Sequence, residues 1–478
     1  MLRRTKIVVT VGPATDDPGV LRDMMKEGVD VVRLNASHGT REDQLRRLKL
    51  IRETVSSLGR SVGVLLDLSG PKIRIECFRE GRVMLEEGKP FALDTALDPK
   101  AGTVEQVGVA YKDLPKDVAK GDTLLLADGQ IVLDIERVSG TRIDTVVRVG
   151  GELSDRKGLN RQGGGISAPA LSDKDREDIR FAAEVGVDYL AVSFARDAAD
   201  IEQARMLVRK AGGAAHLVAK IERQEAVANL TGIIEAADVV MVARGDLGVE
   251  MGYAELTGLQ KTIIHESRSR NRVVITATQM MESMIQNPLP TRAEVSDVAN
   301  AVMDGTDAVM LSAETAAGRY PVRAVRAMAE VIEGAEKYQI AHVRTRHRAE
   351  GLFSSTEEAI AMAVMYTSNH LKVRAIVALT ESGATPLFMS RIRADLPIYA
   401  FTRHEKTRLR VTLYRGVYPV IFDVIRGESA EPLYRSIFAR LLELKLVDRG
   451  DHVILTKGEL SGVEGGTNSL QILKVALD

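Results

Sequence analysis

The 478-residue sequence predicts an α/β protein in three parts: a (β/α)8 barrel, an all-β domain inserted into that barrel, and a C-terminal open α/β domain. Short runs of aliphatic and β-branched residues alternate with longer amphipathic segments over most of the chain. These apolar runs are continuous, which is typical of parallel strands buried on both faces, and each is followed by a segment long enough for a crossover helix. The chain is also too long for one ordinary core, so two or three domains are expected.

The predicted barrel consists of eight strand–helix units, with helical stretches such as 41–58 and 197–210 between the strands. Eight is the number of units in a TIM barrel, whose functional sites form at the carboxyl ends of the strands. We expect the barrel to comprise residues 1–70 and 166–342. Its predicted strands are residues 5–11, 30–34, 62–66, 188–193, 216–221, 238–243, 273–277 and 307–311.

Residues 71–165 interrupt this alternation and have little helical periodicity. They contain alternating polar and apolar runs, for example residues 121–138, separated by Gly and Asp residues that are typical of tight turns. We therefore predict a small all-β domain between the third and fourth strands. Gly163, Gly164 and Gly165 lie near its return to the barrel and would permit hinge motion.

Residues 343–478 are predicted to form the separate open α/β domain, and the polar segment HVRTRHRAEG marks the boundary before it. The predicted strands of this domain are residues 374–379, 397–402, 417–422, 451–456 and a last strand near SLQILKV.

The charge balance of the chain excludes partners that need a strongly charged surface. Lys and Arg number 65 against 66 Asp and Glu, a formal net charge of −1, so we expect no nucleic-acid or membrane partner, and any anion must be bound by a local cluster. The single cysteine, Cys77, excludes an internal disulfide and suits a reducing compartment. The N-terminal apolar run is too short for a signal sequence and nothing later approaches a membrane span, so we expect a cytoplasmic protein.

Polar and charged residues gather at the carboxyl ends of seven predicted barrel strands. Taken one at a time, these residues have ordinary structural interpretations. A lysine two residues before a glutamate is most often a solvated ion pair, and Arg33 could be a core arginine paired with Asp67. Their occurrence together on one rim favours a functional site. The residues are Arg33, Asn35, Ser37, His38, Asp67, Lys72, Ser193, Phe194, Arg196, Lys220, Glu222, Arg244, Asp246, Glu250, Thr278, Gln279, Ser312 and Glu314.

The residue types at these ends indicate chemistry on an oxygen-rich anion. Glu222 and Asp246 are hard oxygen ligands suited to Mg²⁺ or Mn²⁺, with substrate oxygens completing the shell. Lys220, Arg33 and Arg74 supply positive charge, which points to phosphoryl or carboxylate chemistry. The sequence contains neither GxxxxGK[ST] nor GxGxxG, so a nucleotide would not bind through a P-loop or a dinucleotide fingerprint.

Seven segments of the chain closely resemble pyruvate kinases, and the resemblance extends over the inserted and C-terminal domains. The segments are TKIVVTVGP, VVRLNASHG, DLSGPKIR, LVAKIE, VMVARGDLGVE, ATQMMESM…PTRAEVSDVANAV and DGTDAVMLSAETAAGRYP. The resemblance implies transfer of the phosphoryl group of phosphoenolpyruvate to ADP, giving pyruvate and ATP in glycolysis, with Mg²⁺ (or Mn²⁺) as the metal. It also implies a homotetramer and a lid function for the inserted domain.

The resemblance implies roles for the matching residues as well. Glu222 and Asp246 would hold the metal, and Lys220 would stabilise charge on the transferring phosphoryl group. Thr278 lies where the family places a threonine near the carbon that is protonated. The other catalytic or substrate-binding positions are Arg33, Arg74, Ser312 and Glu314, with the backbone at Ala243, Arg244, Gly245 and Asp246 receiving the substrate carboxylate. The nucleotide side comprises Asn35, His38, Arg74 and Lys157, and both Lys157 and Asp128 match positions on the active-site side of the lid. Ala317 stands where the family often has a basic residue, which weakens any nucleotide contact there.

Lys72 bears on the need for a monovalent cation. Family members that require K⁺ use residues matching Asn35, Ser37, Asp67 and the carbonyl of Leu68, and typically carry glutamate at the position of Lys72. A lysine ammonium is a compact charge that can replace K⁺ beside the phosphate. We therefore hypothesise that Lys72 substitutes for K⁺, which is then not required. The alternative is a lysine that points into solvent.

The segment ALTESGATP, residues 378–386, follows a predicted strand and opens a helix, with Thr385 as the expected N-cap and Pro386 at the first helical position. In related proteins this loop binds the phosphate of an allosteric sugar phosphate, which makes Thr380, Ser382, Gly383 and Thr385 candidates for that role. Glu381 stands where activation by fructose 1,6-bisphosphate usually goes with lysine, and the chain has no Trp to stack on that effector. We expect a sugar monophosphate or AMP as the effector; the alternative is an ordinary capped turn.

Two other functions remain open at this point. One is a metal-dependent pyruvate or oxaloacetate lyase on the same barrel, which ADP-dependent turnover would distinguish. The other is a non-catalytic phosphosugar sensor, which loss of catalysis in Lys220→Met would exclude.

Overall fold

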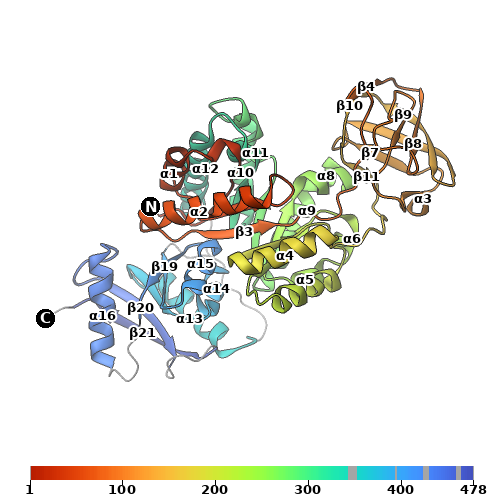
Figure 1. The fold of residues 1–478 in the computed structure, drawn as a ribbon. Coiled ribbons are helices and arrows are strands. Elements are labelled where there is room, and N and C mark those ends of the chain that lie inside the picture. The colour runs from red at the N-terminus through yellow and green to blue at the C-terminus, as the bar shows by residue number, and fades with distance from the viewer. Residues whose placement is uncertain (1, 343–352, 393–395, 424–429, 459–464, 477–478) are drawn as a thin grey trace. The chain divides into compact units, whose positions relative to one another are not determined.

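The computed structural model describes residues 2–342, 353–392, 396–423, 430–458 and 465–476 (Figure 1). The chain forms two compact units. One comprises Met1–Leu66, Val187–Tyr189 and Ser267–Asp478, and the other comprises Asp67–Gly186 and Leu190–Glu266. The limits predicted for the three domains remain a prediction.

The eight predicted barrel strands are present, each within one residue of its expected bounds, and they close in the order β1-β16-β15-β14-β13-β12-β3-β2. The neighbouring pairs whose register is defined, such as β1 with β16 and β13 with β14, are parallel. The strands are almost wholly buried, as their continuous apolar sequences predict. They are β1 (Lys6–Thr10), β2 (Val31–Asn35), β3 (Gly63–Asp67), β12 (Tyr189–Val192), β13 (His216–Ile221), β14 (Val239–Ala243), β15 (Val273–Ala277) and β16 (Ala308–Leu311).

Helices follow the barrel strands, and several begin at capping boxes that can be read in the sequence. The hydroxyl oxygens of Thr40, Ser172 and Thr291 each accept a hydrogen bond from the N–H three residues later. The helical segments are η1 (Pro13–Thr15), α1 (Pro18–Lys26), α2 (Arg41–Ser57), α4 (Asp173–Val185), α5 (Ala198–Lys210), α6 (Gln224–Ala228), α7 (Leu230–Ala236), α8 (Arg244–Met251), α9 (Tyr253–Ser269), η2 (Glu282–Ile285), α10 (Arg292–Asp304), α11 (Ala313–Ala316) and α12 (Pro321–His342).

The inserted segment is a separate, strand-rich domain with its own core, as predicted. Its six-stranded sheet has the order β11-β7-β8-β9-β5-β6, and β10 pairs with β4 in a second sheet. Buried Phe91, Leu124 and Ile143 belong to its core. The elements are β4 (Arg82–Leu85), β5 (Pro90–Asp94), β6 (Gln106–Gly108), α3 (Leu114–Asp117), β7 (Thr123–Leu126), β8 (Ile131–Ser139), β9 (Arg142–Val149), β10 (Gly151–Ser154) and β11 (Leu159–Arg161).

The C-terminal domain is the predicted open α/β sheet, with strand order β19-β18-β17-β20-β21 and an antiparallel β21 at the edge. The predicted boundary segment lies outside the described residues except for His342, the last residue of α12. The elements are α13 (Thr356–His370), β17 (Ala375–Leu379), α14 (Ala384–Ser390), β18 (Ile398–Thr402), α15 (Glu405–Arg410), η3 (Val411–Leu413), β19 (Val417–Ile421), α16 (Ala430–Glu443), β20 (His452–Gly458) and β21 (Thr467–Lys474).

A buried ion pair joins this domain to the start of β16. Arg391, directly after α14, pairs with Asp307 through both carboxylate oxygens, and its Nη1 also donates to the carbonyl of Arg272 at 2.7 Å. Both side chains of the pair are almost completely buried. Removing one partner would therefore leave the other charge uncompensated in the interior.

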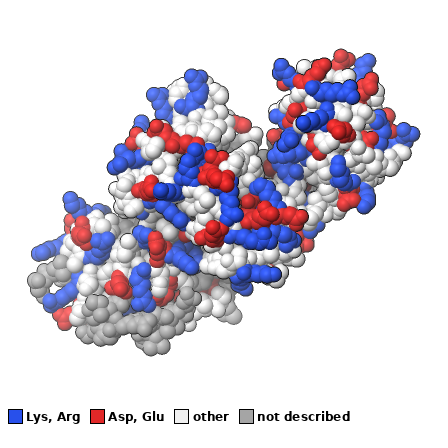
Figure 2. Space-filling view, viewed as in Figure 1, with Lys and Arg blue, Asp and Glu red and all other residues white. Residues whose placement is uncertain are grey.

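Charges of both signs are interspersed over the visible surface, without a large region of one sign (Figure 2). This pattern agrees with the near-neutral composition. In the parts of the chain that the structure describes, no helix combines the length and apolar character needed to cross a membrane.

Candidate functional site

Lys220 and Glu222 form the centre of the candidate site, at the carboxyl end of β13. The Lys220 Nζ lies 2.8 Å from Glu222 Oε1 and 3.4 Å from Asp67 Oδ1. It also donates a hydrogen bond of 2.8 Å to the hydroxyl of Ser193. Glu222 and Asp67 are each only 1% exposed, so the three side chains form a buried cluster. The alternative interpretation from the sequence, a solvated ion pair of Lys220 with Glu222, is therefore wrong.

The environment of Glu222 opposes its ionisation unless a cation is near. Burial raises the pKa of Glu222, the adjacent Lys220 ammonium lowers it, and the charge of Asp246 raises it again. The backbone N–H of Phe194 donates to Glu222 Oε2 at 2.7 Å and fixes the carboxylate. Phe194 itself has a positive φ of 57°, a strained conformation next to the cluster.

Asp246 lies in the first turn of α8 and faces Lys72. The Lys72 Nζ is 3.3 Å from Asp246 Oδ1 and 3.8 Å from Asp128 Oδ1. Its side chain is 29% exposed, so Lys72 lies against two carboxylates instead of extending into solvent. Ala243 is the N-cap of α8, and Arg244 is buried, with its Nη1 3.4 Å from Gln260 Oε1.

Glu222 and Asp246 fit a divalent metal that also binds substrate. The two carboxylates are close enough for one to raise the pKa of the other, and a divalent cation would relieve that repulsion. Within the described ranges, no group of three or more His, Cys, Asp or Glu side chains is arranged to hold a metal. The remaining ligands would be water and substrate oxygens, which is the usual mode for Mg²⁺.

Asp67 and Leu68, two of the four residues expected at a monovalent-cation site, also belong to this cluster. Asp67 ends β3, and the carbonyl of Leu68 accepts a hydrogen bond of 2.8 Å from the Ser193 hydroxyl. The side chains assigned to the lid are more exposed. Arg74 donates to the carbonyl of Arg156 at 2.9 Å, and both Lys157 and Asp128 lie at the surface.

Arg33, Asn35, Ser37 and His38 lie at the end of β2, in the first unit. Arg33 is buried, and its Nη1 donates to the Thr10 hydroxyl at 3.0 Å. Asn35 Oδ1 accepts the N–H of Ser37 at 3.0 Å, which shapes the turn after the strand. Ser37 and His38 are exposed.

The end of β15 carries backbone strain at the threonine singled out in the sequence. Thr278 and Gln279 have positive φ values of 67° and 52°, which are rare for a β-branched residue such as threonine. Such strain clusters at functional sites. The Thr278 hydroxyl donates to the carbonyl of Ala277 at 2.6 Å.

Glu314 follows β16 as a buried carboxyl. It accepts the N–H groups of Ser312 at 2.7 Å and Met281 at 3.2 Å, and burial raises its pKa. The Ser312 hydroxyl oxygen is buried and has no hydrogen-bond partner among the described residues.

The loop proposed for effector binding has an N-cap different from the predicted one. α14 begins at Ala384, with Gly383 as its N-cap at φ 89°, so the assignment of Thr385 as the N-cap was wrong. Thr385 is buried, and its hydroxyl shares a hydrogen bond of 2.8 Å with that of Thr467. The N–H groups of Gly383 and Ala384 point to the hydroxyls of Thr380 and Ser382, respectively. Glu381 pairs with Arg403 at 3.3 Å and contacts His404.

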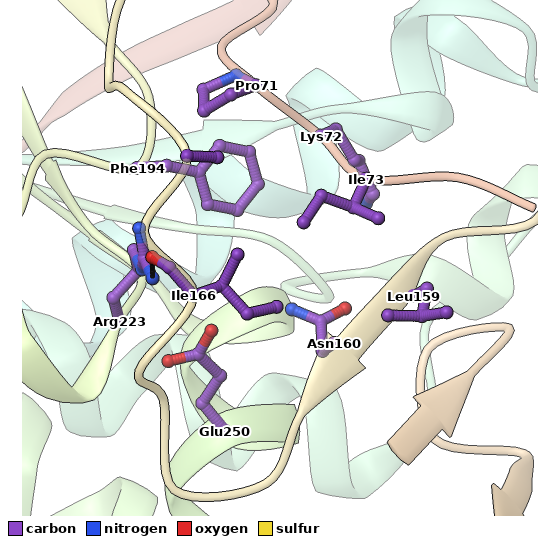
Figure 3. A pocket seen from close by; sticks show the side chains of 10 residues that line it. Pro71, Lys72, Ile73, Leu159, Asn160, Ile166, Phe194, Arg223 and Glu250 are labelled. Atoms are coloured by element: carbon purple, nitrogen blue, oxygen red, sulfur yellow. Dashed lines mark hydrogen bonds between the residues drawn. The ribbon is translucent and has the colours of Figure 1, made fainter. Parts of the chain in front are cut away.

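A small pocket beside the main cluster includes residues that the sequence did not single out. It is lined by Pro71, Lys72, Ile73, Leu159, Asn160, Ile166, Ala168, Phe194, Arg223 and Glu250 (Figure 3). Only Lys72, Phe194 and Glu250 were expected to be functional. Of the remaining residues, only Arg223 could have been found from the sequence, because it directly follows Glu222.

Comparison with known proteins decides the family. The family model described as pyruvate kinase, barrel domain, matches residues 2–325, and the model described as pyruvate kinase, alpha/beta domain, matches residues 358–473. The chain belongs to the pyruvate kinase family. Because both models match in their expected order, the family assignment includes the C-terminal domain, and the chain is a phosphotransferase.

Individual relatives match over nearly the full length. The chain is 53% identical to pyruvate kinase II of Salmonella typhimurium, covering 99% of each chain. It is 52% identical to the pyruvate kinase of Haemophilus influenzae, covering 96% of each. The crystal structure of a pyruvate kinase from Cryptosporidium parvum superposes with a TM-score of 0.91 at 32% identity, covering 99% of this chain and 96% of that one. The lyase and sensor alternatives receive no support from these family members.

Proposed function

We propose that this chain transfers the phosphoryl group of phosphoenolpyruvate to ADP, giving pyruvate and ATP in glycolysis. The observation that carries the proposal is the position of Lys220, held among Asp67, Ser193 and Glu222 close to a second carboxylate, Asp246. A fixed cation beside a two-carboxylate metal site is the arrangement that phosphoryl transfer needs.

The residues of this cluster divide the work of charge stabilisation. Glu222 and Asp246 would hold Mg²⁺ (or Mn²⁺), which when bound neutralises negative charge on phosphoryl and enolate oxygens. Lys220 stabilises the transferring phosphoryl group, and the contacts to Asp67 and Ser193 orient its ammonium in advance. Arg33 and Arg74 add positive charge for the phosphate.

Backbone groups and a proton relay serve the rest of the substrate. The carboxylate of phosphoenolpyruvate would bind the backbone at Ala243, Arg244, Gly245 and Asp246, because the first-turn N–H groups of a helix favour anions. Thr278, in its strained conformation, would lie near the enolate carbon that accepts the proton. Ser312 and Glu314 would pass the proton, and the raised pKa of Glu314 favours a carboxyl that can hold one.

The nucleotide would bind on the side of Asn35, His38, Arg74 and Lys157. The inserted domain would close as a lid and exclude water, with Asp128 and Lys157 on its active-site side.

Lys72 is proposed to take the place of the K⁺ that relatives bind with residues matching Asn35, Ser37, Asp67 and the carbonyl of Leu68. The support is its ammonium 3.3 Å from Asp246, where a positive charge beside the metal site is needed. A monovalent cation would then add little to the rate.

The effector, the assembly and the location are proposals by family resemblance. We propose that Thr380, Ser382, Gly383 and Thr385 bind the phosphate of a sugar monophosphate or AMP, that the enzyme is a homotetramer, and that it acts in the cytoplasm, where glycolysis occurs. A thermal-shift panel of sugar phosphates and AMP tests the first point, and absence of stabilisation by every compound would remove it. Light scattering tests the second.

The deciding experiment is pyruvate release from phosphoenolpyruvate, ADP and Mg²⁺ in a K⁺-free buffer, then with K⁺ added. Full activity before the addition is expected. Activity only with K⁺ would keep the enzyme and reject the role of Lys72, and inactivity in both buffers would reject the proposed function.

A further inference from the structure

The two connections between the inserted domain and the barrel meet at the pocket shown in Figure 3. Pro71, Lys72 and Ile73 belong to the outgoing connection, and Ile166 and Ala168 belong to the returning one. Arg223 and Glu250 reach the pocket from the loop after β13 and from α8. The same loop begins with the proposed metal ligand Glu222, so it contacts both the metal site and the lid connection.

Arg223 holds the returning connection through its backbone. Its Nη2 donates to the carbonyl of Ile166 at 2.8 Å and lies 3.2 Å from Glu225 Oε1. Arg223 is only 4% exposed, so its guanidinium has little access to solvent and depends on these two contacts for hydrogen bonding. A hydrogen bond from a buried charged donor is stronger than an ordinary one.

Glu225 holds the glycine run that precedes Ile166. Its Oε1 accepts the N–H of Gly165 at 2.6 Å. Gly163, Gly164 and Gly165 have φ values of 84°, 71° and 88°, a conformation that favours glycine. A Cβ on Gly164 would lie 2.9 Å from Glu225 Oε2, so the glycine also permits the close approach.

Glu250 completes the contacts from the opposite side. Its Oε2 accepts the N–H of Gln224 at 3.0 Å, and its carboxylate accepts a side-chain hydrogen bond from Asn160 on β11. One carboxylate therefore joins α8, the first residue of α6 and strand β11 of the inserted domain. In Figure 3 the side chains of Glu250, Asn160 and Arg223 converge on the pocket.

We propose that Arg223, Glu225 and Glu250 form a clip that fixes the returning lid connection to the loop carrying Glu222. They are positioning residues: they set where the lid rests, and they make the connection respond when Glu222 binds a metal. This inference rests on the proposed function for its purpose, but the contacts between the clip and residues 163–166 do not depend on catalysis.

The clip explains why three consecutive glycines occur at residues 163–165, which a need for flexibility alone does not explain. A run of three glycines that only had to bend would need no fixed partner, whereas here Glu225 accepts the N–H of Gly165 and Arg223 contacts the carbonyl of the next residue. Binding at Glu222 should therefore restrict the connection, because the loop and the connection are bonded to each other.

Backbone hydrogen exchange of residues 163–168 in the full-length protein tests the clip. Arg223→Gln removes the guanidinium, and Arg209→Gln, at an exposed position of α5, is the matched control. We expect exchange in Arg223→Gln to be faster by about tenfold or more, the effect of one lost charge-assisted hydrogen bond. Arg223→Lys should restore part of the protection, because an ammonium can still donate to the Ile166 carbonyl. Exchange equal to that of Arg209→Gln would overturn the proposal.

Mn²⁺ alone serves as the probe for the coupling. In the wild type and in Arg209→Gln, saturating Mn²⁺ should slow exchange of residues 163–168; in Arg223→Gln this slowing should be lost while Mn²⁺ still binds, as measured by electron paramagnetic resonance. Equal slowing in both variants would reject the coupling. An enzyme that failed to form pyruvate but passed these tests would lack the proposed function and retain the clip, so the two failures are distinguishable.

Discussion

Glu250 should make the stability of the protein depend on pH, and Glu250→Gln should remove that dependence. Burial raises the pKa of Glu250 to about 7 from its ordinary value of 4.5, while the N–H of Gln224, the charge of Arg223 and the Asn160 amide oppose the rise. The charge of Glu225 adds to the rise. Glu250 is 6% exposed, so little solvent screens it.

The direction of the change in unfolding free energy with pH follows from proton binding to Glu250. Between its ordinary pKa and about 7, the folded protein holds a proton on Glu250 that the unfolded chain has released, so the free energy of unfolding falls as pH rises through this window. One pKa unit corresponds to about 1.4 kcal/mol, which gives a total of about 3 kcal/mol as an upper limit, most of it lost between about pH 5 and pH 8. Glutamine keeps an oxygen for the Gln224 N–H and carries no charge.

Urea unfolding followed by far-UV circular dichroism at pH 5 and pH 8 measures the difference. The wild type should lose about 2–3 kcal/mol more than Glu250→Gln on going to the higher pH. Glu255→Gln, at an exposed position of α9, is the control and should behave like the wild type. If Glu250→Gln lost as much stability as the wild type, the carboxyl would be ionised in the folded protein already at pH 5.

Three further predictions concern the site and its support. Lys220→Met should lower kcat by at least about 10²–10³-fold with an unchanged circular dichroism spectrum, because it removes the cation proposed to stabilise the phosphoryl group; near-normal turnover would remove Lys220 from the mechanism. Lys72→Glu should create a dependence on K⁺ in the pyruvate-release assay, and unchanged activity without K⁺ would place that lysine outside the site. Arg391→Met should lower the free energy of unfolding by about 3–5 kcal/mol, because Asp307 is left charged and buried; a change below about 1 kcal/mol in the urea experiment would show that the pair is compensated in another way.

The strand positions were predictable because burial on both faces leaves a continuous apolar run, and each run lies within one residue of an observed barrel strand. Lys220 and Glu222 were predictable as a pair because strand geometry puts alternate residues on one face. The clip could not be predicted from the sequence, because the contact between Arg223 and the Ile166 carbonyl depends on where the chain returns after a whole inserted domain. The N-cap of α14 was misplaced because Thr385 matches the usual capping preference, whereas the structure uses Gly383 at a positive φ.

Residues 73–75, at the start of the inserted domain, pair with residues 157–159 near its end, and this paired stem has a consequence for how the chain folds. The N–H of Leu159 donates to the Ile73 carbonyl at 2.9 Å, and the N–H of Ile75 donates to the Lys157 carbonyl at 3.0 Å. β3 and β12, which flank the insertion in sequence, are neighbours in the barrel. Closing an unstructured loop becomes more costly in entropy as the loop lengthens.

A paired stem shortens the loop that must be closed when β12 joins β3. The inserted domain has its own hydrophobic core, so during synthesis it can fold before β12 has left the ribosome. The later strand then docks against a preformed module whose ends already lie together, and the non-local step of barrel assembly becomes nearly local. A substitution that weakens the stem should therefore slow refolding of the barrel more than it lowers the stability of the folded enzyme.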